Sequence, residues 1–103
     1  MSEAKIRSSQ FEVFGRVQGV FFRKNTIEAA KRLGVRGWCM NTKEGTVKGV
    51  IEGEEKPFNE MKRWLTETGS PQSKIDKTVF TVAELIDAYT FPGFEIRRVP
   101  KKK

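Results

Sequence analysis

Two positive side chains, Arg23 and Lys24, stand at the start of a predicted helix, where cations are normally disfavoured. A helix N-terminus carries a partial positive charge and unpaired backbone N–H groups, so Asp, Asn, Ser or Thr usually occupies it. Here residues 19–22 (Gly-Val-Phe-Phe) offer no side-chain oxygen, and the first acidic residue of the helix is Glu28. A bound anion would satisfy both the N–H groups and the two cations.

The loop before this helix has the composition of a phosphate-binding loop. Gly15 and Gly19 permit backbone conformations in which successive N–H groups converge, and the guanidinium of Arg23 can contact two phosphate oxygens at once. Charge and capping alone leave a second interpretation open, in which water solvates the helix start and Arg23 is an ordinary surface residue. The loop matches neither glycine-rich pattern that binds nucleoside triphosphates or dinucleotides, so we expect no nucleotide cofactor.

The rest of the sequence offers little acid–base or metal chemistry. It contains no histidine, the most common general base and metal ligand. Its one cysteine, Cys39, follows Trp38 in a predicted strand, which favours a buried inert thiol over a nucleophile. Glu52, Glu54 and Glu55 fit a helix start better than a metal site. Such a chain would act by positioning and electrostatics, which suits a substrate with an anionic handle and a good leaving group, such as an acyl phosphate.

The hydrophobic pattern predicts the elements that position these residues. An apolar face at helical spacing predicts a helix over Phe22–Leu33, and Gly34 suits the position after its end. A second apolar face predicts a helix from near Glu55 to the stop at Gly69. Strands are predicted at Ser9–Phe14, Val35–Asn41, Thr46–Glu52, within Thr78–Ala83 and around Phe94–Arg97.

The order of these elements is strand, helix, strand, strand, helix, strand, with a short extra strand. It predicts an α+β fold, a ferredoxin-like split βαβ sandwich with two helices on one face of an antiparallel four-stranded sheet plus a short fifth strand. Because this fold supports many functions, it does not identify the activity.

Length and charge set further limits. The 103 residues suit one domain covering 1–103. The net charge is +7, and residues 94–103 carry +4 of it, which leaves +3 for residues 1–93. This basic tail is either a solvated terminus or a contact for nucleic acid or anionic lipid. A lone cysteine, no apolar signal segment and no membrane-spanning run lead us to expect a cytoplasmic protein.

Two segments resemble the signature motifs of the acylphosphatase family. Gly15–Arg23 fits the pattern G-x-V-Q-G-V-x-F-R. Further matches lie in Gly37-Trp38, Asn41-Thr42, Gly45-Thr46-Val47, Gly49 and Glu52-Gly53. The likeness covers about residues 8–97, leaves 98–103 as a basic tail, and is nearest to the common or muscle-type small acylphosphatases. It implies a metal-independent hydrolase that converts an acyl phosphate into a carboxylate and inorganic phosphate.

The resemblance also implies a role for each matching site residue. Arg23 would hold the phosphate and stabilise transition-state charge, and Asn41 would orient the attacking water through its amide. From the residues alone, a turn-forming role for Asn41 is the simpler interpretation. Thr42 would support Asn41 by a hydrogen bond, or is a plain strand-end threonine. The loop whose backbone N–H groups would bind phosphate consists of Gly15, Arg16, Val17, Gln18, Gly19 and Val20.

The expected ligands are therefore a small acyl phosphate and inorganic phosphate. The resemblance implies no metal, no cofactor and no covalent intermediate, and we expect a monomer without a membrane or nucleic-acid partner. An RNA-binding module shares the element order but needs aromatic residues on its third strand, and residues 46–52 contain none. A non-catalytic anion sensor would need Arg23 but has no evident use for Asn41.

The C-terminal part departs from the family pattern. Arg98 stands where family chains often end in a tyrosine, and residues 99–103 extend beyond it, which puts the anchoring of the last strand in question. Glu84–Phe91 is also more apolar than we expect of this loop. Its apolar residues either pack on the sheet edge or form a contact patch.

Overall fold

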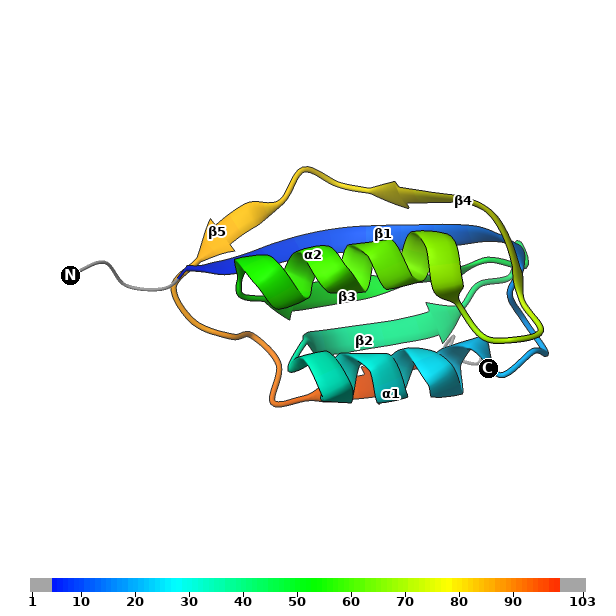
Figure 1. Cartoon of the computed structure of the whole chain (residues 1–103), viewed down its shortest axis with the longest axis horizontal. Coiled ribbons are helices and arrows are strands. Elements are labelled where there is room, and N and C mark those ends of the chain that lie inside the picture. The colour runs from blue at the N-terminus through cyan, green and yellow to red at the C-terminus, as the bar shows by residue number, and fades with distance from the viewer. Residues whose placement is uncertain (1–4, 99–103) are drawn as a thin grey trace, which may run out of the picture.

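The chain forms a six-stranded sheet with two helices on one of its faces (Figure 1). The structure, a computed structural model, describes residues 5–98. Within this range no helix has the length and apolar character needed to cross a bilayer. The elements are β1 (Ile6–Arg16), α1 (Phe22–Leu33), β2 (Arg36–Asn41), β3 (Val47–Gly53), α2 (Glu55–Arg63), a π-helical turn (Trp64–Thr68), β4 (Lys74–Phe80), β5 (Glu84–Ile86) and β6 (Phe94–Ile96).

The strand order confirms the ferredoxin-like split βαβ sandwich. The strands lie in the order β4-β1-β3-β2-β6, and β5 pairs with the beginning of β1. The four strands β4, β1, β3 and β2 pair antiparallel as the sequence predicts. The short extra strand β6 pairs with β2 in parallel, so the sheet as a whole is mixed. The direction of β6 follows from the place where the chain enters it. β5 ends at the end of the sheet where β1 and β2 begin, and the chain passes to β6 at that same end. β6 therefore runs in the same direction as β2.

The first helix begins and ends at the predicted residues. Phe22, Thr26, Ala29 and Ala30 are buried at helical spacing. Gly34 follows with φ 79°, and its backbone N–H is bonded to the carbonyls of the last turn. Glycine adopts this left-handed conformation without the steric cost that a side chain brings, so it ends the helix where the sequence predicts.

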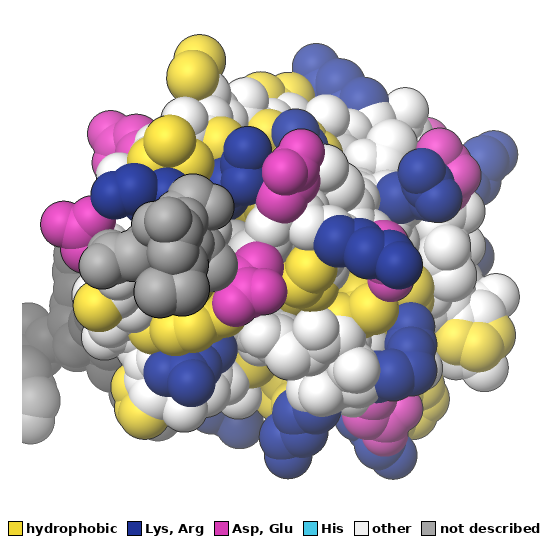
Figure 2. Space-filling model, turned by 60° about the vertical axis from the view of Figure 1, so that its left-hand side comes forward, with side chains coloured by type: hydrophobic (Ala, Val, Ile, Leu, Met, Phe, Trp, Pro, Cys, Tyr) yellow, Lys and Arg dark blue, Asp and Glu magenta, His cyan; other side chains and the backbone are white. Residues whose placement is uncertain are grey.

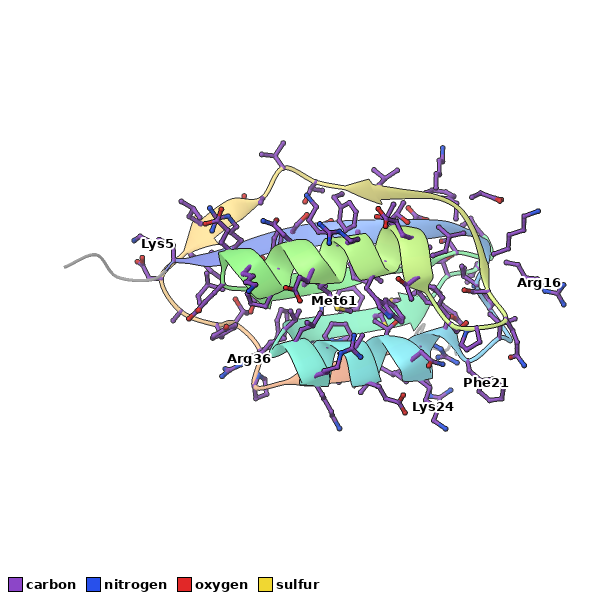
Figure 3. The ribbon with its side chains drawn as sticks, viewed as in Figure 1. Lys5, Arg16, Phe21, Lys24, Arg36 and Met61 are labelled. Carbon is purple, nitrogen blue, oxygen red and sulfur yellow. The ribbon has the colours of Figure 1, made fainter. Side chains whose placement is uncertain are left out.

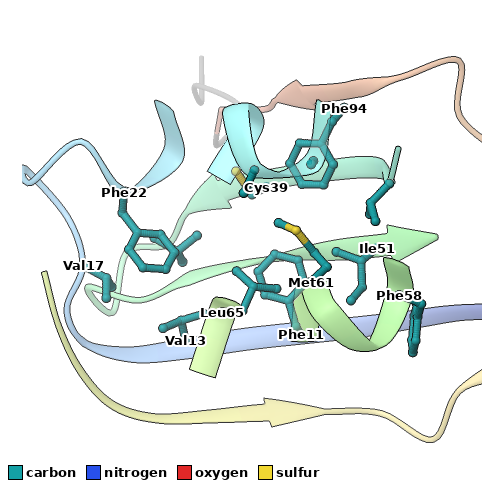
Figure 4. Close-up of a cluster of buried hydrophobic side chains, with 14 of the residues drawn as sticks. Phe11, Val13, Val17, Phe22, Cys39, Ile51, Phe58, Met61, Leu65 and Phe94 are labelled. Atoms are coloured by element: carbon teal, nitrogen blue, oxygen red, sulfur yellow. The ribbon is translucent and has the colours of Figure 1, made fainter. Parts of the chain in front are cut away.

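The core lies between the helices and the sheet (Figure 4). Val17 and Phe22, at the two ends of the connection between β1 and α1, both belong to it. Their burial anchors that connection at both ends, which limits how far its backbone can move. The buried hydrophobic residues of the core are Phe11, Val13, Val17, Val20, Phe22, Ala29, Ala30, Val35, Cys39, Val47, Ile51, Phe58, Met61, Leu65 and Phe94.

The last third of the chain differs most from the prediction. A strand is predicted within Thr78–Ala83, but β4 ends at Phe80, and β5 was not predicted. β4 is an edge strand whose side chains are all at least partly exposed, so it lacks the apolar alternation that identifies a half-buried strand. In β5, Leu85 is 60% exposed, while Ile86 is partly buried opposite the beginning of β1.

The segment between β5 and β6 packs against the sheet rather than forming a free loop. The buried carboxylate of Glu52 accepts a hydrogen bond from the backbone N–H of Thr90 at 2.8 Å. Arg36 donates to the carbonyl of Phe91 at 3.4 Å, and its guanidinium carbon lies 3.9 Å from the ring centroid of Tyr89. Of the two interpretations of this apolar segment, the structure favours packing for Tyr89 and Phe91.

Candidate functional site

The candidate site lies at the end of the sheet where β1 and β2 finish and α1 begins (Figure 3). A register shift between Phe14 and Gly15 interrupts the pairing of β1 with β4, which continues to Arg16. Gly15 has φ 132°, and a Cβ there would lie 2.1 Å from the carbonyl oxygen of Lys74, so no other residue fits. Gly19 has φ 75° in open space. The two predicted loop glycines are thus needed for the turn of the backbone and for a close approach.

The helix start is uncapped, as the sequence predicts. Among the described residues no side chain caps the first turn of α1, and no acidic side chain lies in that turn. The N-cap residue is Phe21, with φ 61° and ψ 25°, and its side chain is 65% exposed. A left-handed conformation costs a non-glycine residue about 1–2 kcal/mol. Such strain, together with an exposed aromatic ring, marks this helix start as a functional candidate.

Arg23 and Asn41 come together at two adjoining clefts. The first, which we call the loop cleft, has a volume of about 300 Å³. The second, the C-terminal cleft, has a volume of about 290 Å³. Both are lined by Arg23 and Asn41; the loop cleft adds Val17, Gly19, Phe21, Phe22, Lys24 and Ile96, and the C-terminal cleft adds Thr42, Lys43, Arg97 and Arg98.

The side-chain amide of Asn41 has an unused hydrogen-bond acceptor. Its Oδ1 is buried and has no hydrogen-bond partner within the described part of the chain. A buried polar atom without a partner costs about 1–3 kcal/mol. A half-turn of the amide exchanges Oδ1 with Nδ2, so the group can offer either an acceptor or a donor to a bound ligand. Asn41 therefore has the hydrogen-bonding capacity to hold a water molecule beside Arg23.

Gln18 ties the loop to the β2–β3 hairpin. Its Nε2 donates to the carbonyl oxygens of Thr42 and Thr46, both at 2.9 Å. Because Thr42 directly follows Asn41, these two bonds connect the loop to the strand end that carries the amide. The sequence assigns Gln18 a backbone role alone, and this side-chain role was missed because it depends on how the loop and the hairpin meet in space.

Thr42 does not support Asn41 in the way we expected. Its hydroxyl lies 2.6 Å from that of Thr46 and accepts a hydrogen bond from the Thr46 backbone N–H at 3.1 Å. Thr46 in turn donates to the carboxylate of Glu12 at 2.6 Å. Thr42 thus closes the hairpin after β2, and its influence on Asn41 is through the backbone. The Thr42 hydroxyl bonds to Thr46 instead of to Asn41, because the hairpin turn places Thr46 next to it.

The thiol of Cys39 lies in the core beneath this site. Burial raises the pKa of Cys39 to about 12, and the nearby positive charge of Arg23 opposes the shift. The thiolate is the nucleophilic form, so a thiol with this pKa is unreactive at neutral pH. This agrees with the expectation of an inert cysteine.

The remaining predicted loop residues contribute to the backbone rather than to the cleft wall. Val20 is buried, and the side chain of Arg16 is exposed and extends away from the sheet (Figure 3). Lys43, Ile96 and Arg97 line the clefts but were not predicted as site residues. The sequence signal for Arg97 was the positive charge at the C-terminus, which we interpreted as part of a basic tail.

A larger cleft, of about 650 Å³, lies at the opposite end of the sheet. Figure 2 looks toward that end, where Lys and Arg side chains are interspersed with Asp and Glu. Such mixed charge gives no net attraction for an anion. No predicted site residue lies there; its lining is Lys5, Arg7, Glu54, Glu55, Lys56, Pro57, Asn59, Glu60 and Arg63.

Comparisons with known proteins agree with one another. The model of the family described as Acylphosphatase matches residues 9–96. The chain is 49% identical over 100 residues to Acylphosphatase-1 of Drosophila melanogaster, covering 97% of this chain and 83% of that protein. It is 47% identical over 98 residues to human Acylphosphatase-2, covering 94% and 99%. A solved structure of an acylphosphatase from Coxiella burnetii has a TM-score of 0.80 and 30% identity, covering 94% of this chain and all of that one.

Proposed function

The chain belongs to the acylphosphatase family, whose members hydrolyse acyl phosphates to a carboxylate and inorganic phosphate, and from this premise we propose that the reaction takes place in the loop cleft. The family is one of hydrolases that act on the carboxylic–phosphoric anhydride bond. The observation that carries the assignment is that Arg23 and Asn41 line one cleft beside an uncapped helix start.

The phosphate group of the substrate is held by the loop and by Arg23. Backbone N–H groups at the start of α1 and in the loop Gly15–Val20, whose first two residues also pair with β4, donate to its oxygens, and the helix dipole favours its negative charge. Arg23 adds a guanidinium that can contact two oxygens. As the bond to the leaving group breaks, these donors stabilise the charge on the phosphoryl oxygens, and they need little rearrangement because the loop is anchored by Val17 and Phe22.

The attacking water is oriented by Asn41. Its amide oxygen accepts a hydrogen bond from the water, which satisfies the acceptor that is otherwise buried without a partner. The water oxygen bonds to phosphorus, the bond from phosphorus to the acyl oxygen breaks, and the electron pair of that bond leaves with the carboxylate. The proton of the water passes to a phosphate oxygen. The leaving carboxylate is a weak base, so no general acid is required.

The same chemistry supports the finer expectations. We propose that turnover needs neither metal nor cofactor, because the described residues hold no cluster of three His, Cys, Asp or Glu side chains that could bind a metal. We further propose that the protein acts as a monomer, because Arg23 and Asn41 of the same chain line the loop cleft together. We propose the cytoplasm as its compartment, because the single cysteine, Cys39, is an unpaired thiol. The physiological acyl group is addressed below.

Hydrolysis of benzoyl phosphate, followed in the ultraviolet, tests the proposal. Turnover should persist in the presence of a chelator and should be inhibited competitively by inorganic phosphate. Arg23→Ala should lose both turnover and phosphate binding, whereas Asn41→Ala should lose turnover and still bind phosphate, as measured by calorimetric titration. The loss of one preorganised donor reduces a rate by about 10²–10³. Losses below tenfold in both variants, with the fold intact by circular dichroism, would overturn the site assignment.

A further inference from the structure

An exposed aromatic side chain stands at the mouth of the loop cleft and has no part in binding phosphate. Phe21 is 65% exposed although it is one of the larger hydrophobic residues of the chain. It lines the loop cleft and also a third cleft, of about 320 Å³, which we call the outer cleft. Lys24 likewise borders both. The remaining lining of the outer cleft is Asn25, Glu28, Pro71 and Gln72.

The direction of the reaction decides where the acyl group lies. In phosphoryl transfer the attacking and leaving oxygens are roughly in line with phosphorus between them. Asn41 and Ile96, which line one part of the loop cleft, belong to β2 and β6 of the sheet. Phe21 and Lys24 come instead from the loop and helix, and both side chains extend away from the sheet (Figure 3). Water held by Asn41 therefore attacks from the sheet side, and the acyl group leaves toward Phe21 and Lys24.

The C-terminal cleft suits the acyl group less well. It shares both Arg23 and Asn41 with the loop cleft, and the side chains that it adds are Thr42, Lys43, Arg97 and Arg98. The three added cations raise the positive potential around the site and attract the phosphate, but none of the added side chains offers an apolar surface to an acyl body.

We propose that Phe21 and Lys24 form the acyl subsite of this enzyme and give it a preference for acyl groups with an apolar or aromatic body. The proposal rests on the proposed function and adds the substrate class. The ring of Phe21 packs against the acyl body, and Pro71 adds a second apolar wall in the outer cleft. The ammonium of Lys24 faces the carboxylate that forms as the anhydride bond breaks.

The backbone conformation of Phe21 is consistent with this role. Its left-handed φ of 61° is the one positive φ of a non-glycine residue in the described part of the chain. The residue next along the chain, Phe22, is buried in the core, whereas Phe21 is directed into solvent at the cleft mouth. A hydrophobic ring held exposed by a strained backbone gains from a ligand that covers it. Phosphate alone is too small and too polar to do so.

The ratio of kcat/KM for benzoyl phosphate to kcat/KM for acetyl phosphate tests the role of Phe21. An aromatic contact contributes about 0.5–1.5 kcal/mol, which is a factor of roughly 2–12. Phe21→Gly removes the ring without adding backbone strain, and the ratio should fall about fivefold. Phe21→Tyr should retain the wild-type ratio. Val82→Gly is the matched control, because Val82 is 90% exposed and lies outside the three clefts around the helix start.

A series of ring-substituted benzoyl phosphates tests the role of Lys24. Each substituent changes the pKa of the leaving carboxylic acid, and a residue that stabilises the leaving carboxylate makes the rate less sensitive to that pKa. Lys24→Gln should therefore steepen the dependence of log kcat/KM on leaving-group pKa. Lys31→Gln, the same charge change in the last turn of α1, should leave the slope as in the wild type.

The outcomes separate this proposal from the one on which it rests. Absence of hydrolysis of both acetyl phosphate and benzoyl phosphate by the folded wild type would overturn the proposed function. Hydrolysis of both substrates with an unchanged ratio in Phe21→Gly, or with an unchanged slope in Lys24→Gln, would overturn the acyl subsite alone. A lower ratio in the first variant and a steeper slope in the second would support it.

Discussion

Replacement of Gln18 by leucine should weaken phosphate binding about tenfold, through the loss of the two hydrogen bonds that tie the loop to the hairpin. Gln18 donates to the carbonyl oxygens of Thr42 and Thr46, both at 2.9 Å. Burial anchors the loop at Val17, Val20 and Phe22, and the stretch between Val17 and Val20 is fixed by the side chain of Gln18. Without it, the backbone N–H groups have to be ordered when phosphate binds.

The magnitude follows from the remaining partners of the two carbonyls. A neutral hydrogen bond contributes about 0.5–1.5 kcal/mol net, and more is lost when a buried partner stays unsatisfied. Here each carbonyl keeps another donor: Gly45 N–H lies 3.3 Å from the Thr42 oxygen, and Thr42 N–H lies 2.9 Å from the Thr46 oxygen. No acceptor is orphaned, so the total loss should be about 1.5 kcal/mol, equivalent to about tenfold in affinity.

The inhibition constant of phosphate against benzoyl phosphate hydrolysis measures this effect, and urea unfolding measures stability in parallel. Gln10→Leu is the matched control, because Gln10 is an exposed glutamine of β1, the strand that precedes the loop. A Gln18→Leu protein that is about 1.5 kcal/mol less stable but has the wild-type inhibition constant would refute the reasoning. The tether would then serve the fold alone.

Two further predictions concern stability. Phe21→Gly should raise the free energy of unfolding by about 0.5–1 kcal/mol, because relief of left-handed strain exceeds the added flexibility of glycine in the unfolded chain; a lower melting temperature would contradict this. Cys39 has a folded pKa of about 12 against 9.0 for the free thiol, so its burial stabilises the protein below pH 9 and this contribution is lost as pH rises toward 12. The stability difference between wild type and Cys39→Ala should shrink by about 1 kcal/mol between pH 9 and pH 10, measured by urea unfolding. An unchanged difference would show that the thiol does not titrate in this way.

The sequence was most informative where a single local rule decides the structure. Helix α1 was predicted residue for residue because its apolar spacing and Gly34 depend on nothing outside the helix. The absence of a side-chain cap at the start of α1 was also predictable, because it depends only on the residues next to the helix start. The order of elements then brings Arg23 to Asn41, because the split βαβ fold sets the end of β2 beside the start of α1.

What the sequence did not indicate depends on contacts between distant segments. The tether from Gln18 to the hairpin requires a particular approach of two loops, and no local pattern encodes it. The hydroxyl of Thr42 bonds to Thr46 rather than to Asn41, and this choice depends on the geometry of the hairpin turn. The prediction of β4 was displaced toward the C-terminus because this edge strand has no buried residue, and only a few of its residues, such as Ile75 and Phe80, pack against the core. The predicted tail beyond Arg98 lies outside the described residues.

Three features of this site break the local rules that hold elsewhere in the fold. The start of α1 has unpaired N–H groups, Phe21 has a left-handed backbone, and the Asn41 amide has an acceptor without a partner. Each carries a cost of about 1–3 kcal/mol that an ordinary sequence would avoid. All three border the loop cleft. Substrate binding relieves two of them, because the phosphate accepts hydrogen bonds from the N–H groups and the attacking water donates one to the amide oxygen. The strain at Phe21 is not relieved by phosphate or water, which is why the acyl group is the part of the substrate that we expect its side chain to meet.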